Sequence, residues 1–214
     1  MVKAIFFDLD GTLLDTVPDI MGCLNFVLAR YGYPLLTESD TRAFVGNGAR
    51  RLVELSVPPW APAEEILAEF RTRYAVCANA HTRIYEGAGE CLANLKARGV
   101  KLAVITNKPH EATQRVVSQF FPDLFDFVGG DSGSFPVKPD PALVRYAALT
   151  LRVSSAECLF VGDGETDVQT ARNAKMRCVA ALWGYRSRAQ LEAAGAKLFA
   201  SSFCELENIT EKFL

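Results

Sequence analysis

The sequence predicts an α/β fold: a core built on a parallel sheet, with an all-helical segment inserted after the first strand. Three observations carry this prediction. A short apolar run stands at the start of the chain, residues 16 to about 82 contain no convincing strand, and strand-like and helix-like segments alternate from about residue 84 onward. Alternation of this kind indicates a parallel sheet covered by helices on both faces.

The first half of the chain supplies one strand and then helices. Residues 3–8 are apolar and rich in Ile and Phe, which favours a buried strand. Thr16, with Pro18 in the first turn and Asp19 three positions after the threonine, favours a helix that continues to about Tyr31. Thr37 and Asp40 form a second capping signature. The helices expected after it are 38–44, 47–56 and 62–79.

The second half alternates. Gly99 is placed to end a helix directly before a strand, as a C-terminal glycine should. The expected strands are 101–106, 125–129, 158–162 and 177–182, and the expected helices are 87–98, 110–120, 140–151 and 166–174. We therefore expect a catalytic core made of residues 1–15 and 84–214, and a helical cap domain of residues 16–83, with hinges near 15–18 and 82–87.

Composition limits the class of protein. The chain has 214 residues, of which 50% are hydrophobic and 22% charged, so it can bury a core. A formal net charge of −2 argues against nucleic acid as the main partner. Neither a membrane span nor a signal peptide is indicated, and the six cysteines show no Cys-x-x-Cys spacing, so we expect a cytoplasmic protein with reduced thiols. The oligomeric state is not indicated.

Polar residues suited to handling phosphate follow four strand-like runs. Ligands of open α/β sheets bind at the carboxyl ends of the strands, so these residues should meet at one edge. They are Asp8, Asp10 and Gly11 after the first run, Thr106 and Asn107 after the second, Lys138 beyond the third, and Asp163 and Asp167 after the fourth.

Each of these residue types has a role in phosphate-ester hydrolysis. A carboxylate at Asp8 can attack phosphorus and form an aspartyl-phosphate. Asp10 can protonate the leaving oxygen and then activate water. Gly11 allows a sharp turn whose following amides can face phosphate oxygens. Thr106 and Asn107 can hydrogen-bond the phosphoryl group, and Lys138 can hold it by charge.

The charge balance of this set predicts a metal. The four aspartates and Lys138 leave three net negative charges, into which a phosphate dianion would have to move. Like charges about 4 Å apart repel by roughly 4 kcal/mol at an effective dielectric constant near 20. Mg²⁺, which prefers carboxylates and substrate phosphate, would relieve this repulsion, and Asp163 and Asp167 are spaced to lie near one ion.

Asp8-Leu9-Asp10-Gly11-Thr12-Leu13, Thr106-Asn107, Lys138-Pro139 and Gly162-Asp163-x-x-x-Asp167 resemble, in order and spacing, the four motifs of the haloacid dehalogenase-like hydrolase superfamily. Four segments are similar to ones of its phosphoglycolate phosphatase group: Phe44-Val45-Gly46-Asn47-Gly48-Ala49, Ile105-Thr106-Asn107-Lys108-Pro109, Gly129-Gly130-Asp131 and Lys138-Pro139-Asp140-Pro141. The resemblance implies a Rossmann-like core, Mg²⁺, Asp8 as nucleophile and Asp10 as acid and base. It also implies that the metal lies on Asp8, the Asp10 carbonyl and Asp163, with Asp167 in the coordination shell or just behind it.

Substrate choice should depend on the cap. Gly46, Asn47 and Gly48 are placed to open a helix, whose N-terminus can receive an anion such as a substrate carboxylate, and Arg50 or Arg51 can assist. The alternative interpretation is that Gly46, Asn47 and Gly48 form only a turn between two helices and that the arginines are exposed to solvent. The leading function is a Mg²⁺-dependent phosphatase of small phosphorylated metabolites, with 2-phosphoglycolate the first candidate substrate. The alternatives are a phosphomutase of the β-phosphoglucomutase type, a pyrophosphatase or nucleotidase, and a non-catalytic binding protein.

Overall fold

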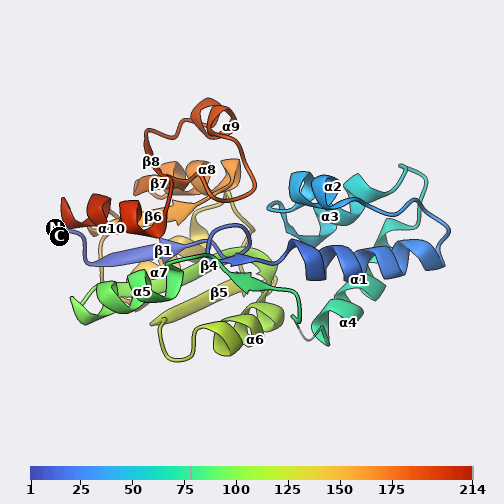
Figure 1. The fold of residues 1–214 in the computed structure, drawn as a ribbon, viewed down its shortest axis with the longest axis horizontal. Helices are drawn as coiled ribbons and strands as arrows, with labels where there is room; N and C mark the ends of the chain where they lie inside the picture. The colour runs from blue at the N-terminus through green and yellow to red at the C-terminus, as the bar shows by residue number, and fades with distance from the viewer. Residues whose placement is uncertain (78, 214) are drawn as a thin grey trace.

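The protein consists of a sheet covered by helices and a separate group of helices at one end of the molecule (Figure 1). The computed structural model describes residues 1–77 and 79–213. Its six-stranded sheet has the order β5-β4-β1-β6-β7-β8, and every neighbouring pair is parallel, which confirms the predicted fold class. The strands are β1 Ala4–Phe7, β4 Lys101–Pro109, β5 Phe127–Asp131, β6 Cys158–Gly162, β7 Arg177–Ala181 and β8 Leu198–Ala200.

Helices cover both faces of the sheet because its central strand is apolar on both sides. Ile5 and Phe7 pack into one cluster with side chains of α5, α6 and α10, whereas Ala4 and Phe6 pack into another with side chains of α7 and α8. The short helix α9 packs beside α8. The bounds are α5 Ala88–Ala97, α6 His110–Phe120, α7 Ala142–Thr150, α8 Glu165–Asn173, α9 Arg188–Ala193 and α10 Phe203–Glu211, and a 3₁₀ turn lies at Ser155–Glu157.

The helices α1 to α4 form a second unit, here called the cap, around an apolar cluster that also reaches Ala112 of α6 in the core. Helical spacing explains how α1 contributes to it, since Ile20, Leu24 and Leu28 all lie on its buried face. The bounds are α1 Val17–Arg30, α2 Glu38–Phe44, α3 Gly48–Ser56 and α4 Ala63–Ala75.

The predicted helix 62–79 is shorter in the structure. It ends at Ala75, because its buried face ends with Tyr74 and Val76 is 81% exposed. Position 78 of that prediction lies outside the described residues.

The chain enters and leaves the cap at neighbouring places. The short strand β2, Leu14–Asp15, pairs antiparallel with β3, Arg83–Ile84. Just inside the cap, the carboxylate of Asp19 accepts hydrogen bonds of 2.7 Å from both the main-chain N–H and the hydroxyl of Thr82. These contacts support the predicted division of the chain at 16 and 83, which we keep as a proposal.

The start of α1 differs from the capping prediction. Thr16 stands at the N-cap, but its hydroxyl makes no capping bond and donates instead to Oδ1 of Asp10, at 2.7 Å. The backbone of Thr16 is helical, with φ −105° and ψ −4°, whereas a capping residue has an extended backbone that turns its side-chain oxygen toward the free N–H groups of the first turn. At α2 the prediction is confirmed, because Thr37 and Asp40 cap each other's main-chain N–H.

Two further expectations concern the chain as a whole. All six cysteines are free thiols, as predicted. Within the described part of the chain, none of the helices combines the length and apolar character that a bilayer crossing requires.

Candidate active site

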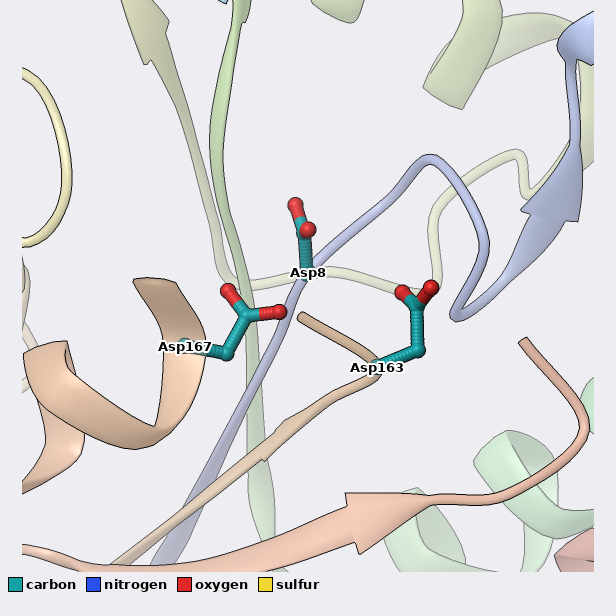
Figure 2. A group of neighbouring side chains, drawn as sticks. All are labelled: Asp8, Asp163 and Asp167. Carbon is teal, nitrogen blue, oxygen red and sulfur yellow. The ribbon is translucent and has the colours of Figure 1, made fainter. Parts of the chain in front are cut away.

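Three aspartates gather at the edge of the sheet where the strands end (Figure 2). Asp8 follows β1, Asp163 follows β6, and Asp167 lies in the first turn of α8. Phe7 is paired with Val161 across the sheet, so the two strands deliver Asp8 and Asp163 to the same edge. One carboxylate oxygen from each aspartate lies within 4.8 Å of the others, and all three residues are buried. This is the convergence that the strand-end pattern predicted.

Lys138 is bonded to two of these aspartates. Its Nζ lies 2.9 Å from Oδ1 of Asp8 and 2.7 Å from Oδ1 of Asp167. Burial would lower the pKa of Lys138, but the Asp167 and Asp8 carboxylates more than offset this and raise it, so the side chain is a cation. Asn107 fixes the loop that carries the lysine, because its Oδ1 accepts from the Lys138 N–H at 2.7 Å and its Nδ2 donates to the Lys138 carbonyl at 3.2 Å.

The aspartate cluster carries more negative charge than its lysine balances. Burial, and then the neighbouring Asp167 carboxylate, raise the pKa of Asp8 to about 7 against the opposing effect of Lys138. Burial and the carboxylates of Asp167 and Asp8 raise the pKa of Asp163 to about 7 as well. Buried carboxylates with raised pKa values indicate a place that a further positive charge would stabilise.

Main chain and hydroxyl groups surround Asp163 closely. The Thr12 hydroxyl donates to its Oδ1 at 2.7 Å and the Tyr185 N–H donates to its Oδ2 at 2.8 Å. At Gly11, where φ is +86°, a Cβ atom would lie 2.3 Å from Asp163 Oδ2. At Gly184 a Cβ atom would lie 2.2 Å from the Asp163 Cβ. Thr12 and the loop after β7 were not assigned by sequence reasoning, and the latter carries no motif that could have identified it.

Asp10 lies between the aspartate cluster and the cap. It accepts from the Thr16 hydroxyl, and Lys108 Nζ lies 2.9 Å from its Oδ1 and 3.1 Å from its Oδ2. Thr106 is buried near the end of β4, and its hydroxyl accepts from the Lys108 N–H at 3.3 Å. Sequence reasoning included Lys108 in the strand-end motif but gave it no role.

The structure brings part of the predicted cap set to the site. Gly46 and Gly48 line a cavity of about 40 Å³ together with Asp8 and Asp10. Asn47 lines a neighbouring cavity with Asp163 and Asp167.

Arg50 lies elsewhere. Its side chain is 57% exposed and pairs with Glu64, and it lines neither cavity. Two residues along a helix correspond to about 200° of rotation, so Arg50 points away from the buried Leu52. Arg51 pairs on the surface with Glu54.

One arginine of the core holds the cap against the site. The guanidinium of Arg186 donates to the main-chain carbonyls of Arg42 at 2.7 Å, Ala43 at 3.1 Å and Val45 at 2.7 Å, at the end of α2. Its Nε lies 3.0 Å from Glu165, at the start of α8. The last carbonyls of a helix have no partner within the helix, so this arginine satisfies groups that would otherwise need water.

Comparisons with known proteins agree with this arrangement. A family model of haloacid dehalogenase-like hydrolases matches residues 5–181. The phosphoglycolate phosphatase of Xanthomonas campestris is 34% identical over 188 residues, which cover 86% of this chain and 85% of the relative. The crystal structure of a candidate phosphoglycolate phosphatase from Lactobacillus delbrueckii has a TM-score of 0.91 at 32% identity and covers 97% of each chain. CbbY from Rhodobacter sphaeroides, solved in complex with phosphate, has a TM-score of 0.80 at 25% identity and covers 96% of each chain.

The chain therefore belongs to the haloacid dehalogenase-like hydrolase family. Within it the chain falls in the phosphoglycolate phosphatase-like group, as the motifs predicted. It is an enzyme, a phosphoric monoester hydrolase.

Proposed function

We propose that the protein is a Mg²⁺-dependent phosphatase that hydrolyses small phosphorylated metabolites through an aspartyl-phosphate on Asp8, with 2-phosphoglycolate as the leading substrate. The arrangement of Asp8 carries the proposal. This buried carboxylate is held by Lys138 at 2.9 Å and lines the same cavity as Asp10. The names of the relatives support the substrate, and a small phosphorylated metabolite fits the cytoplasmic location expected from the sequence.

The donor set fits Mg²⁺. Asp8, Asp163 and Asp167 offer hard oxygen ligands within 4.8 Å of one another, the type of ligand that Mg²⁺ prefers. Asp8, Asp163 and the Asp10 carbonyl would hold the ion, with Asp167 as a ligand or directly behind one. If Asp10 is ionised as well, the four aspartates bring four negative charges, and Lys108 and Lys138 bring two positive ones; the proton on Asp10 in the first chemical step removes one of the four. When bound, the ion would supply the positive charge that lets a phosphate dianion approach these carboxylates.

The first chemical step transfers the phosphoryl group to the enzyme. An oxygen of Asp8 forms a bond to phosphorus while the bond from phosphorus to the ester oxygen breaks. The leaving oxygen takes the proton of the Asp10 carboxyl group. Lys138 orients Asp8 and balances its charge, and Thr106 and the main chain after Gly11 hydrogen-bond the phosphoryl oxygens. Asn107, predicted to bind the phosphoryl group as well, has its side-chain amide bonded to Lys138 and Gly46 and so positions the loop that carries Lys138.

The second step returns the enzyme to its starting state. The Asp10 carboxylate takes a proton from a water molecule, whose oxygen bonds to phosphorus. The bond from phosphorus to Asp8 breaks, which releases inorganic phosphate and restores both carboxyl groups. Gly46, Asn47 and Gly48 of the cap close over the site during this cycle and exclude other water, and the cap opens for product release.

The test is phosphate release in Mg²⁺ from a panel of 2-phosphoglycolate, sugar phosphates, nucleotides and pyrophosphate. The control is Asp8→Asn, which keeps the size of the side chain and removes the nucleophile. We expect release to depend on Asp8 and on Mg²⁺, with the highest kcat/KM for 2-phosphoglycolate. Phosphate transfer between positions of a sugar phosphate without net release would indicate a mutase, and full turnover by Asp8→Asn would disprove the mechanism.

A further inference from the structure

Lys108 is a buried cation for which the two chemical steps have no use. It lies near the end of β4 and is 5% exposed. Its Nζ contacts both carboxylate oxygens of Asp10 and lies 2.5 Å from the hydroxyl oxygen of Tyr74. Tyr74 belongs to α4 of the cap, so Lys108 stands where cap and core meet.

The cavity beside Lys108 is the place for the leaving group. It measures about 40 Å³, and Asp8 and Asp10 form part of its wall. A phosphoryl group held at Asp8, with its ester oxygen toward Asp10, directs the rest of the substrate into this space. The cap supplies the opposite wall with the apolar side chains Ile20, Val45, Leu52 and Phe70. A small volume with such walls favours a compact leaving group.

A negative charge on that leaving group would need a partner, because apolar walls cannot solvate it. Of the described residues that line the cavity, Lys108 is the one with a cationic side chain. Tyr74 adds a second donor. Since the ammonium donates to the tyrosine oxygen, the hydroxyl hydrogen of Tyr74 stays free to donate to another acceptor.

We propose that Lys108 and the Tyr74 hydroxyl recognise a carboxylate on the leaving group, and thereby favour phosphate esters of short hydroxy acids over neutral esters. The inference rests on the proposed phosphatase function and names the group that selects its substrate. The three hydrogens of the Lys108 ammonium point to Asp10 Oδ1, Asp10 Oδ2 and the Tyr74 oxygen. The substrate carboxylate would take over one of these contacts, so that it shares the cation with Asp10. It replaces Arg50, the arginine that the sequence suggested for this role.

A pair of substrates isolates the carboxylate. These are 2-phosphoglycolate and 2-phosphoglycolamide, in which a neutral amide of nearly the same size replaces the carboxylate. For Lys108→Met we expect kcat/KM on 2-phosphoglycolate to fall about 30-fold more than on the amide, the range of one charge-assisted contact. Lys108→Arg keeps the charge and should retain most of the preference. Tyr74→Phe should lose a part of it.

Equal losses on the two substrates would overturn the proposal, because Lys108 would then serve Asp10 or the fold alone. The preference for the carboxylate would in that case be unchanged in Lys108→Met, and it would point to the main-chain amides at the start of α3. Thermal unfolding of each variant shows whether it is folded. If Lys108→Met does not fold, Lys108→Arg and Tyr74→Phe still decide between the outcomes.

A binding measurement separates this inference from the proposed function. Calorimetric titration of Asp8→Asn with the two compounds in Mg²⁺ requires no turnover. We expect tighter binding of 2-phosphoglycolate, and loss of that difference when Lys108→Met is added. Absence of hydrolysis by the unaltered enzyme would count against the phosphatase proposal, while the binding difference would still decide the role of Lys108.

Discussion

The ammonium of Lys138 lies 2.7 Å from Oδ1 of Asp167, and the two side chains are 2% and 1% exposed. The same ammonium lies 2.9 Å from Asp8. Removal of one member of a buried ion pair leaves the other charge without water or partner, which is more costly than the pair itself is stabilising. Lys138 thus has two tasks, orientation of the nucleophile and stabilisation of the fold.

Lys138→Met should therefore abolish turnover and lower the free energy of unfolding at pH 8 by about 3 kcal/mol. At pH 5 the loss should be smaller, because the Asp8 carboxyl, whose pKa is raised to about 7, is protonated there and needs no cation. Urea unfolding at both pH values measures this. Lys96→Met, at a surface lysine 37% exposed, is the control and should cost less than about 1 kcal/mol. If Lys138→Met lowered the free energy of unfolding equally at both pH values, Lys138 would not stabilise the fold through the Asp8 carboxylate.

The same carboxyl groups predict how stability depends on pH. Their pKa values are about 7 in the folded protein against an ordinary value of 3.8, so the folded state binds protons more tightly than the unfolded state. In metal-free protein their contribution to stability is complete below about pH 4 and is lost as pH rises to about 7, by a few kcal/mol in all. Asp163→Asn should reduce the loss of stability between about pH 4 and pH 7. Urea unfolding at several pH values in this range measures the free energy of unfolding.

The stabilisation by Mg²⁺ should increase with pH, whereas the stability of the metal-free protein decreases. Because the ion competes with protons for the Asp8 and Asp163 carboxylates, the increase in Tm that it causes should be larger at pH 8 than at pH 5. Thermal unfolding with Mg²⁺ and with a chelator at each pH gives the two differences. The same increase at both pH values would mean that the ion binds elsewhere.

Two glycines provide a matched pair of substitutions. Gly11→Ala places a methyl group where Asp163 Oδ2 lies, at 2.3 Å, in a backbone conformation of positive φ. We expect a fall of at least about 100-fold in kcat, because an error of about 1 Å in the position of a reacting group is enough for that loss. Gly22→Ala in α1 meets no atom within 4 Å and should stabilise the protein by about 0.5 to 1 kcal/mol with activity unchanged. If Gly11→Ala and Gly22→Ala changed kcat to a similar extent, the close packing of Gly11 against Asp163 would be contradicted.

Arg186 should control how tightly the cap lies on the core. Arg186→Met removes the donor to the carbonyls of Arg42, Ala43 and Val45, and it should weaken closure by about 2 kcal/mol, or 30-fold in kcat/KM. Hydrogen exchange of residues 42–48 should become faster while the sheet is unaffected. The control is Arg188→Met, since Arg188 pairs on the surface with Glu192. This variant should change neither kcat/KM nor the hydrogen exchange of residues 42–48. Unchanged or slower exchange of residues 42–48 in Arg186→Met would show that Arg186 does not hold the cap against the core.

Patterns local in sequence predicted the sheet and most of the site. Buried apolar runs identified β1 and β6, and the polar residues directly after them identified Asp8 and Asp163. Short elements were missed: β8 has three residues and α9 has six, too few for a periodicity to show. The helix α10 was also missed, although Ser202 caps it.

Contacts between distant segments could not be predicted. The partner of Lys108 in the cap, Tyr74, is 34 positions away in the sequence and lies on another unit of the fold. Arg186 contacts carbonyls more than 140 positions earlier, and a main-chain acceptor has no sequence signature. Thr16 differs from its sequence pattern for another reason: the pattern favoured a helix cap, but the hydroxyl donates to Asp10, 6 positions earlier.

The pairing of β2 with β3 means that the cap begins and ends at adjacent points of the chain's path. Because these two points of the core are close together, closing the chain between them costs little loop entropy, whatever segment connects them. The cap can therefore be regarded as an exchangeable cassette. A single recombination event could exchange this cassette for a helical unit from another member of the family. Asp8, Asp10, Asp163 and Asp167 and the buried Lys108 and Lys138 would stay with the core, whereas Tyr74 would be replaced. Such a chimera would inherit the reaction from one parent, and its choice of leaving group would depend on both, through Lys108 of the core and the walls of the new cap.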